Sequence, residues 1–180
     1  MILNQEDTVL LVIDIQEKLI NATFNKEMIE TKSKILANVA NILKIPTILT
    51  EQYPKGLGNT IRAIKSSLDD FEVFEKTDFN ALADNKLSGY LDRLNCKQVM
   101  VIGIETHICV HQTVDALLKK GFEVAVIQDA CGSRKDVEHN YALNYMKNSG
   151  AKIKTTEMAV FELLKTARHP DFKEIQGYIK

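Results

Sequence analysis

Residues 98–112 read QVMVIGIETHICVHQ, and this stretch decides how the rest of the chain is interpreted. The apolar run 99–102 is typical of a strand that is buried on both faces of a sheet. Gly103 is expected to end that strand, and the Thr106 hydroxyl is expected to cap the helix that follows. Cys109 falls in the first turn of that helix, where unpaired N–H groups and the helix dipole favour a thiolate. The pattern indicates a nucleophile; the alternative is a small buried cysteine that only packs.

Length and composition limit the classes of protein to consider. The chain has 180 residues, enough for a single domain, 1–180, with a sizeable core. Its net charge of −1 gives no electrostatic support for binding nucleic acid or an anionic membrane. No apolar stretch reaches membrane-spanning length, and the first residues lack the pattern of a signal peptide. The three cysteines form no CxxC pair, which indicates a reducing compartment, so we expect a cytoplasmic protein.

Strand-like and helix-like segments alternate along the chain, with no hairpin signal between them. Strands are expected at 8–14, 47–50, 71–75, 99–102, 122–127 and 152–155. Helices are expected at 27–43, 79–93, 106–120, 135–149 and 156–166, with one more near Pro170, and loops at 51–59 and 129–134. This pattern predicts an α/β fold with three α/β/α layers around a doubly wound, six-stranded parallel sheet in the order 3-2-1-4-5-6. A flavodoxin-like five-stranded domain explains almost as much.

Three chemically useful residues follow predicted strands: Asp14, Lys76 and Cys109. Ligands of such sheets bind at the carboxyl ends of the strands, where the strand order reverses. In the predicted order the first and fourth strands are neighbours, so Asp14 and Cys109 would face each other. Lys76 lies two strands away from Asp14, roughly 10 Å at standard strand spacing, so it must reach inward. Standing alone, Asp14 is equally explained as a loop cap, and Lys76 as a solvated lysine.

These three side chains complement one another in acyl transfer. A thiol is mostly protonated near neutral pH, so Cys109 needs a base, and Asp14 is positioned to accept its proton. A nearby Lys76 would stabilise the negative charges and orient the acid. Backbone N–H groups in the turn 104–109 are candidates for an oxyanion hole. The reaction class that this set serves is attack by a cysteine on a carbonyl carbon.

The sequence segments around Asp14, Lys76 and Cys109 match a known family. They are VLLVIDIQ, FEKTDFNAL and VIGIETHICVHQTVDALLKKGFEVAVIQDACGSR, respectively. The chain resembles the isochorismatase-like cysteine hydrolases along nearly its whole length. Through TEQYPKGLG and HPDFKEIQ it is most similar to the isochorismatase-domain-containing hydrolases. The resemblance implies a catalytic triad of Asp14, Lys76 and Cys109, no cofactor, and a homo-oligomer, dimer or larger. It also implies a cis peptide between Ile104 and Glu105, with the N–H groups of Glu105 and Cys109 aimed at the substrate carbonyl oxygen.

Two departures from related families narrow the expected chemistry. Nicotinamidases of this superfamily bind a metal through an aspartate and two histidines after the second strand. The corresponding region here is Glu51-Gln52-Tyr53, with no histidine before His107, so no metal site is expected. True isochorismatases lack the cysteine nucleophile. The presence of Cys109 therefore favours a small amide or imide-like substrate, cleaved through a thioester acyl-enzyme.

Five further residues are candidates for the substrate pocket: Gln16, Phe24, Tyr53, Ile104 and His107. A packing role explains Gln16, Phe24 and Tyr53 equally well, and for His107 a role outside the pocket is favoured. Two other functions stay open at this point. One is a non-catalytic binding or interaction module with the same fold, since fold does not fix function. The other is a dinucleotide-binding protein, which is disfavoured because no G-x-G-x-x-G turn follows the first strand.

Overall fold

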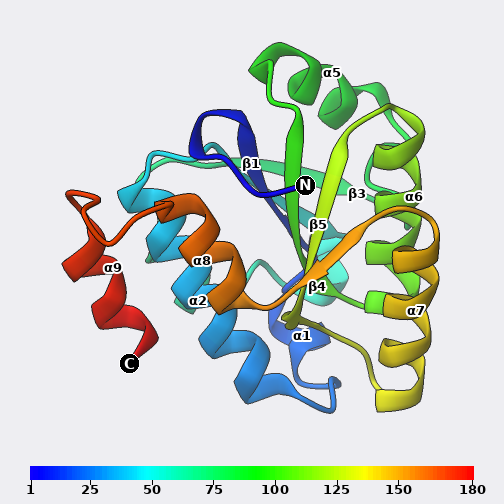
Figure 1. Ribbon diagram of the computed structural model, residues 1–180. Helices are drawn as coiled ribbons and strands as arrows, with labels where there is room; N and C mark the ends of the chain where they lie inside the picture. Colours follow the sequence, from blue (N-terminus) through cyan, green and yellow to red (C-terminus); the bar gives the residue numbers. More distant parts are fainter.

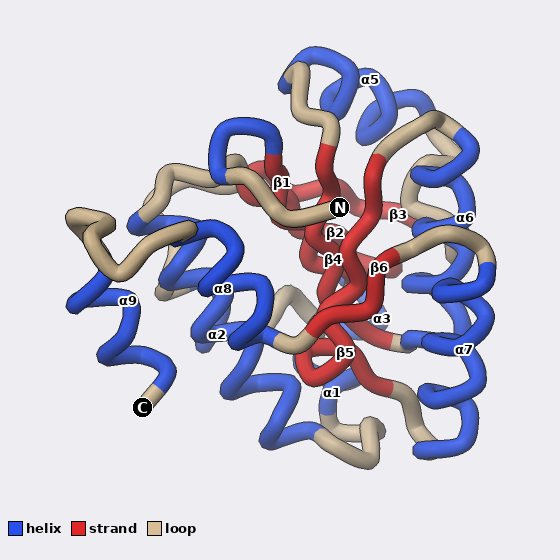
Figure 2. Tube along the Cα trace, in the orientation of Figure 1, coloured by secondary structure: helices blue, strands red, loops and turns tan.

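Six parallel strands form one sheet in a computed structural model that describes residues 1–180 (Figures 1 and 2). The strand order is β3-β2-β1-β4-β5-β6, so the predicted order is confirmed, and the flavodoxin-like alternative is wrong. The strands are β1 (Thr8–Ile13), β2 (Thr47–Gln52), β3 (Glu72–Lys76), β4 (Gln98–Ile104), β5 (Glu123–Gly132) and β6 (Lys152–Lys154). The order reverses between β1 and β4, which places the predicted switch point at the centre of the sheet.

Helices cover both faces of the sheet (Figure 1). One face carries α2 (Lys26–Ile42), α8 (Thr156–Leu164) and α9 (Phe172–Ile179), and the other carries α5 (Asn85–Leu94), α6 (His111–Lys119) and α7 (Asp136–Asn148). Strand β1 contributes side chains to the cores on both faces of the sheet, because successive side chains point to opposite sides. Leu10 and Val12 pack in the core under α2, while Leu11 and Ile13 pack in the core on the face of α5, α6 and α7. All six residues of β1 are buried, as expected for a strand covered on both sides.

Short helical turns fill the connections. They are η1 (Gln5–Asp7), α1 (Glu17–Ile20), α3 (Pro54–Leu57), α4 (Arg62–Lys65) and the π-helical turn η2 (Thr106–Val110). The expected loop at 51–59 is therefore wrong in part, because β2 continues to Gln52 and α3 follows it. The helix expected at 79–93 begins only at Asn85, where Asp84 caps it by accepting a hydrogen bond from the Lys86 N–H. No helix has both the length and the apolar character needed to cross a membrane.

Strand β4 does not end at Gly103, contrary to the sequence prediction. It continues to Ile104, and Gly103 pairs with Ile13 of β1. The φ angle of Gly103 is +151°, and a Cβ at this position would collide with the carbonyl oxygen of Ile13. The glycine therefore lets β1 and β4 stay together up to the edge where Asp14 and the cysteine turn follow.

Strand β5 is also longer than predicted and carries a bulge. Val126 pairs with Val101, but the next pair on β4 is Gly103 with Cys131, so several extra residues of β5 bulge out. The expected loop at 129–134 is therefore wrong for its first part. Asp129 lies in the bulge and accepts hydrogen bonds from the N–H and hydroxyl of Thr156 at the start of α8. The bulge realigns Cys131 and Gly132 beside the end of β4.

We expect Gly103→Ala to lower the free energy of unfolding by about 3 kcal/mol, because a Cβ strains the backbone and overpacks Ile13. The measurement is chemical denaturation at neutral pH. Gly89→Ala in α5 is the matched control, because a Cβ there has no neighbour within 4 Å. This helical glycine should gain about 0.5–1 kcal/mol on substitution. Equal stability of the two variants would show that position 103 accommodates a side chain.

Candidate active site

Asp14 directly follows β1 and is fully buried. Its backbone adopts φ +52°, a left-handed conformation that aspartate tolerates better than most residues. The neighbouring strand holds it twice: its N–H donates to the Thr50 carbonyl at 3.1 Å, and its Oδ1 accepts from the Thr50 hydroxyl at 2.7 Å. A buried carboxylate needs such partners because it has lost its water. The position and orientation of Asp14 are therefore fixed by β2.

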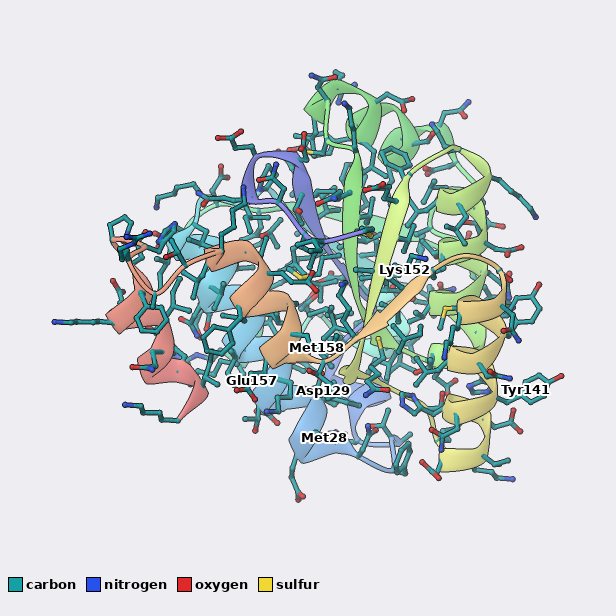
Figure 3. All side chains as sticks on the ribbon, in the orientation of Figure 1. Met28, Asp129, Tyr141, Lys152, Glu157 and Met158 are labelled. Atoms are coloured by element: carbon teal, nitrogen blue, oxygen red, sulfur yellow. The ribbon has the colours of Figure 1, made fainter.

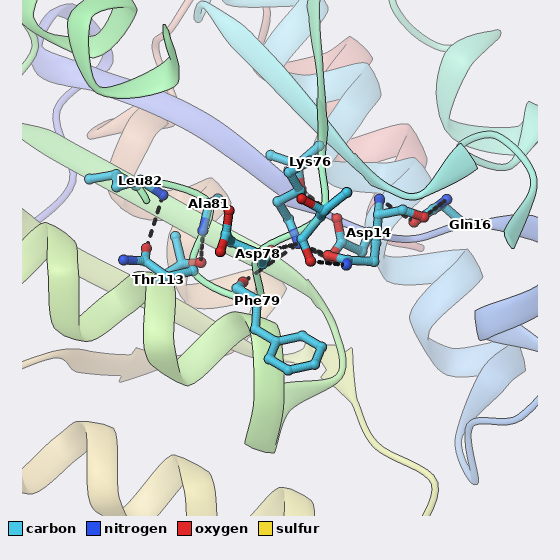
Figure 4. A network of polar contacts seen from close by, with 12 residues as sticks. Asp14, Gln16, Lys76, Asp78, Phe79, Ala81, Leu82 and Thr113 are labelled. Atoms are coloured by element: carbon cyan, nitrogen blue, oxygen red, sulfur yellow. Dashed lines mark hydrogen bonds and ion pairs between the residues drawn. The ribbon is translucent and has the colours of Figure 1, made fainter. Parts of the chain in front are cut away.

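Lys76, the last residue of β3, reaches across β2 to Asp14 (Figure 4). Its Nζ lies 2.6 Å from Asp14 Oδ2, and the side chains of the pair are 7% and 0% exposed. The ammonium also donates to Gln52 Oε1 at 2.6 Å and to the Asp78 carbonyl at 3.2 Å. This is the inward reach that the spacing of the strands predicts. The surface alternative for Lys76 is wrong, because its charge is buried and bound.

Cys109 lies in the π-helical turn η2 that follows β4, and it is 6% exposed. The predicted Thr106 cap is wrong: the residue at the start of the turn is Glu105, and no side chain caps it. The Thr106 hydroxyl instead contacts Nδ1 of His139 at 2.9 Å. π-helical turns of this kind are rare and occur frequently at functional sites.

The resting thiol of Cys109 is protonated, contrary to the thiolate that a helix start would favour. Burial and, to a smaller extent, the negative charge of the nearby Asp14 raise the pKa of Cys109 to about 12, although the charge of Lys76 partly opposes them. Desolvation and the carboxylate thus outweigh the lysine and the turn. These mutual effects show that the three predicted residues come together at one point. A thiol in this environment needs a base before it can attack a carbonyl carbon.

Two hydrogen bonds fix the cysteine turn to the segment after β5. One joins Thr106 to His139 on α7, and the other joins His107 Nδ1 to the buried Ser133 Oγ at 2.9 Å. His139 is itself buried, and its ring lies edge-on to Phe24 at 5.8 Å between centroids. The turn is therefore held by side chains that come from a different part of the chain.

The backbone before the cysteine presents an unpaired donor. The Ile104–Glu105 peptide bond is cis. The Glu105 N–H donates no hydrogen bond within the protein, while the Glu105 carbonyl accepts from the N–H groups of Ile108 and Val110. The Glu105 carboxylate lies apart from this backbone role and pairs with Arg134 at 2.8 Å.

The pocket candidates occupy different environments. Gln16 is fully buried. Its side-chain NH₂ donates hydrogen bonds to the carbonyls of Gln52 and Gly58, and its side-chain oxygen accepts one from the Gln52 N–H, so it holds the segment after β2 in place. Ile104 is fully buried in the core under α2. Phe24 and Tyr53 are 46% and 57% exposed, and Tyr53 borders a hollow of about 400 Å³ beside Lys76. Among these candidates, Phe24, Tyr53 and His107 retain surface that a ligand can contact.

Sequence reasoning missed the residues that position the charged pair, Thr50 and Gln52. The predicted strand order could have indicated Thr50 and Gln52 as partners of the charged pair. Because β2 lies between β1 and β3, side chains at its carboxyl end must lie between Asp14 and Lys76. Ser133 and His139 had no comparable signal, since their contacts depend on the β5 bulge and on how α7 packs. No three His, Cys, Asp or Glu side chains gather in a way that could hold a metal ion.

Comparison with known proteins places this geometry in a family. The isochorismatase domain model matches residues 8–158, which includes all three residues of the buried cluster. The chain belongs to the isochorismatase domain family. Membership of this family supports a hydrolase function for the chain and agrees with the resemblance in its sequence.

Similar proteins cover almost the whole chain. Isochorismatase family protein 1A of Dictyostelium discoideum is 36% identical, over 96% of this chain and 86% of its own. The structure of MAR1 ribonuclease from Caenorhabditis elegans is 37% identical, covers 99% of this chain and 92% of its own, and has a TM-score of 0.94. The YcaC gene product of Escherichia coli, an octameric hydrolase of unknown specificity, shares the fold with a TM-score of 0.89 at 22% identity, over 99% of this chain and 96% of its own.

His139 should make the stability of the protein depend on pH. Burial lowers the pKa of His139 in the folded state, with partial opposition from Asp136. The unfolded chain therefore takes up a proton near pH 6.5 that the folded protein resists, and stability falls as the pH drops below about 6.5. His139→Gln should flatten this pH dependence in denaturation curves between pH 7.5 and 5. An unchanged slope in His139→Gln would contradict the prediction.

Proposed function

We propose that the protein is a cysteine-dependent hydrolase of a small amide or imide-like substrate, with Asp14, Lys76 and Cys109 as its catalytic residues. The observation that carries the proposal is the convergence of a buried, ion-paired carboxylate and a protonated thiol at the switch point of the sheet. A buried cysteine that only packs would not need a carboxylate beside it. Cys131 is the internal comparison: it is fully buried, and its hydrogen-bond partner is the Val101 carbonyl.

The first half-reaction forms a thioester. Asp14 takes the proton from Cys109 Sγ as the sulfur attacks the carbonyl carbon of the substrate. The carbonyl oxygen becomes an oxyanion, for which the N–H groups of Glu105 and Cys109 are the proposed donors. Support for this role comes from the Glu105 N–H, which has no partner in the protein. Asp14 then gives its proton to the leaving nitrogen, and the C–N bond breaks.

The second half-reaction restores the enzyme. Asp14 is the base for a water molecule, which attacks the thioester carbon. The oxyanion forms again, and the C–S bond breaks as Asp14 returns the proton to Sγ, which releases the acid product and restores the Cys109 thiol and the Asp14 carboxylate. Lys76 balances the negative charge of Asp14 while the carboxylate is ionised, and it stays in contact with the carboxyl group while Asp14 carries the proton. The bonds from Thr50 and Gln52 keep both side chains in this arrangement.

The surroundings of the site suggest where the substrate lies. Phe24, Tyr53 and His107 are the proposed pocket residues that retain accessible surface, and they offer two aromatic rings and an imidazole. For Gln16 and Ile104 we propose a supporting role, since neither side chain reaches the surface. The substrate is therefore proposed to be a small molecule. The three cysteines are free thiols, which agrees with a proposed cytoplasmic location.

RNA cleavage is a second candidate, because the similar C. elegans protein is a ribonuclease. The charge distribution of the protein favours RNA cleavage less than it favours hydrolysis of a small amide or imide. The cation at the centre, Lys76, is already committed to Asp14, and the chain has a net charge of −1, whereas phosphate backbones bind to exposed positive charge. A third possibility is a binding module without turnover. An assay with both amides and RNA separates these candidates.

Cys109→Ala should reduce hydrolysis to background on any amide or imide that the wild type cleaves. Asp14→Asn keeps the shape but removes the base, so kcat should fall by about 10²–10⁴-fold. Mass spectrometry after rapid quenching should find the acyl group on Cys109. Cys96→Ser, at a half-buried cysteine outside the site, is the control and should keep full activity.

Three results would overturn parts of this proposal. Undiminished turnover by Cys109→Ala would exclude the cysteine mechanism. RNA cleavage that survives in the same variant would assign a different site to that reaction. A wild type that neither turns over nor acquires an acyl group across the panel would favour the binding module.

A further inference from the structure

Lys76 is followed by a loop, residues 77–84, which connects β3 to α5 and which we name the lysine loop. The backbone of this loop folds around the ammonium group: Lys76 Nζ donates to the Asp78 carbonyl at 3.2 Å and to the Phe79 carbonyl at 3.5 Å. The same ammonium pairs with Asp14 Oδ2 at 2.6 Å (Figure 4). The position of the charge therefore depends on where the loop lies, as well as on its ion pair.

One buried hydrogen bond fastens the middle of the lysine loop. Residues 77–79, 83 and 84 are exposed, whereas Ala81 is buried. The Ala81 N–H donates to Thr113 Oγ1 at 3.0 Å (Figure 4). Thr113 is fully buried, in contrast to Tyr141 on the neighbouring α7, which points away from the body of the protein (Figure 3). The threonine hydroxyl therefore acts inside the protein, where a backbone N–H without an acceptor would destabilise the fold.

Thr113 belongs to the helical segment that carries Cys109. The turn η2 continues directly into α6, and Thr113 follows Cys109 by four residues. Residues with this spacing in a helix lie on the same side of it, one above the other. Cys109 and Ala81 accordingly pack in one apolar core, on the face of α5, α6 and α7. The Thr113 hydroxyl thus joins the segment that carries the thiol to the loop that surrounds the ammonium.

The bond from Thr113 completes a set of three connections around the site. The ion pair joins the ends of β1 and β3. Strand pairing joins β1 to β4, which the cysteine turn follows. Thr113 joins the helix after that turn to the loop after β3. Each of the three segments is therefore held to the other two, and the last connection is made by a hydroxyl that can be removed with little change in the shape of the side chain.

We propose that Thr113 is a positioning residue of the active site. Its hydroxyl holds the lysine loop against α6, and the loop in turn keeps the Lys76 ammonium close to both Asp14 and Cys109. Thr113→Val removes the acceptor of the Ala81 N–H and keeps a side chain of similar shape, whereas Thr113→Ser keeps the hydroxyl. The effect of Thr113 on turnover rests on the proposed function, but its effect on the placement of Lys76 does not.

The placement of Lys76 is tested on the full chain by alkylation with iodoacetamide in alkaline buffer, with mass spectrometry to separate the cysteines. The thiolate is the form that reacts, and the charge of Lys76 lowers the pKa of the Cys109 thiol. An ammonium that is held less firmly near the sulfur therefore slows the reaction at Cys109. We expect Thr113→Val to lower its rate at least about threefold, and Thr113→Ser to react like the wild type. Cys96, which is half-buried and outside the site, is the internal reference and should react equally in all three proteins.

Turnover is the second measurement, on an amide that the wild type cleaves. Because the Thr113 hydroxyl bonds the loop and not the substrate, Thr113→Val should lower kcat about 10-fold and leave KM within about twofold. Thr113→Ser should restore kcat. Thr47→Val is the matched control: Thr47 is also a buried threonine whose hydroxyl bonds a backbone group, the Ile45 carbonyl at 3.2 Å, but it lies at the opposite end of β2 from the site. This variant should keep both the kcat and the Cys109 labelling rate of the wild type.

The results separate this proposal from the hydrolase mechanism. Equal labelling of Cys109 in the wild type and Thr113→Val, or equal slowing in Thr113→Ser, would overturn the role of the hydroxyl whatever the hydrolysis assays show. Faster labelling of Cys109 would show that the substitution only opens the fold, and it would overturn the proposal too. Slowed labelling with an unchanged kcat would overturn the part that concerns turnover. If labelling responds as expected but Cys109→Ala still cleaves the amide, the positioning role stands and the cysteine mechanism fails.

Discussion

The buried ion pair between Asp14 and Lys76 is the interaction on which the arrangement of the site depends. Removing one partner of such a pair leaves an uncompensated charge in the interior, which costs about 3–5 kcal/mol. Replacing either residue alone therefore lowers stability, and the pair connects the ends of β1 and β3 across β2. Thr50 and Gln52 of the intervening strand complete the hydrogen bonding of the two charges. The carboxyl edge of three strands thus forms one rigid polar unit.

Cys109 is placed against this unit by a second constraint, the close approach of β1 and β4 at Gly103. The missing Cβ allows Ile13 and Gly103 to pair at the last position before Asp14. The π-helical turn then returns the chain so that Cys109 meets the carboxylate. Burial explains why the pKa of its thiol rises to about 12 rather than falls. A thiol with a raised pKa is less reactive than a thiolate, because the thiolate is the nucleophilic form.

Much of the architecture was predictable because the strands are buried on both faces. Continuous apolar runs such as 99–102 have few interpretations, and their alternation with helices predicted a parallel sheet; the structure then decided between the six-stranded order and the five-stranded alternative. The sequence predictions were wrong mainly where strand pairing and long-range contacts override the local conformational preference of a residue. Taken alone, Gly103 and Asp129 each predict the end of a strand. Gly103 instead permits close contact between strands, and Asp129 lies in a bulge of β5 and accepts a hydrogen bond at the start of α8. Thr106 has the side chain of a helix cap, but His139 binds its hydroxyl.

The sequence by itself determined the fold class, the strand order and the three residues at the strand ends, because those depend on the spacing of apolar runs and on the residues that follow them. The tertiary structure decided how these groups interact. Lys76 is an inward, bound charge because Asp14 and Gln52 both contact its ammonium group, and the pKa of the Cys109 thiol is raised chiefly because packing removes its water. The hydrogen bonds from Ser133 and His139 join the cysteine turn to residues that lie far from it in the sequence, and no local sequence pattern predicts them. Pairing, burial and long-range hydrogen bonds arise from the whole chain and cannot be read from any single stretch of it.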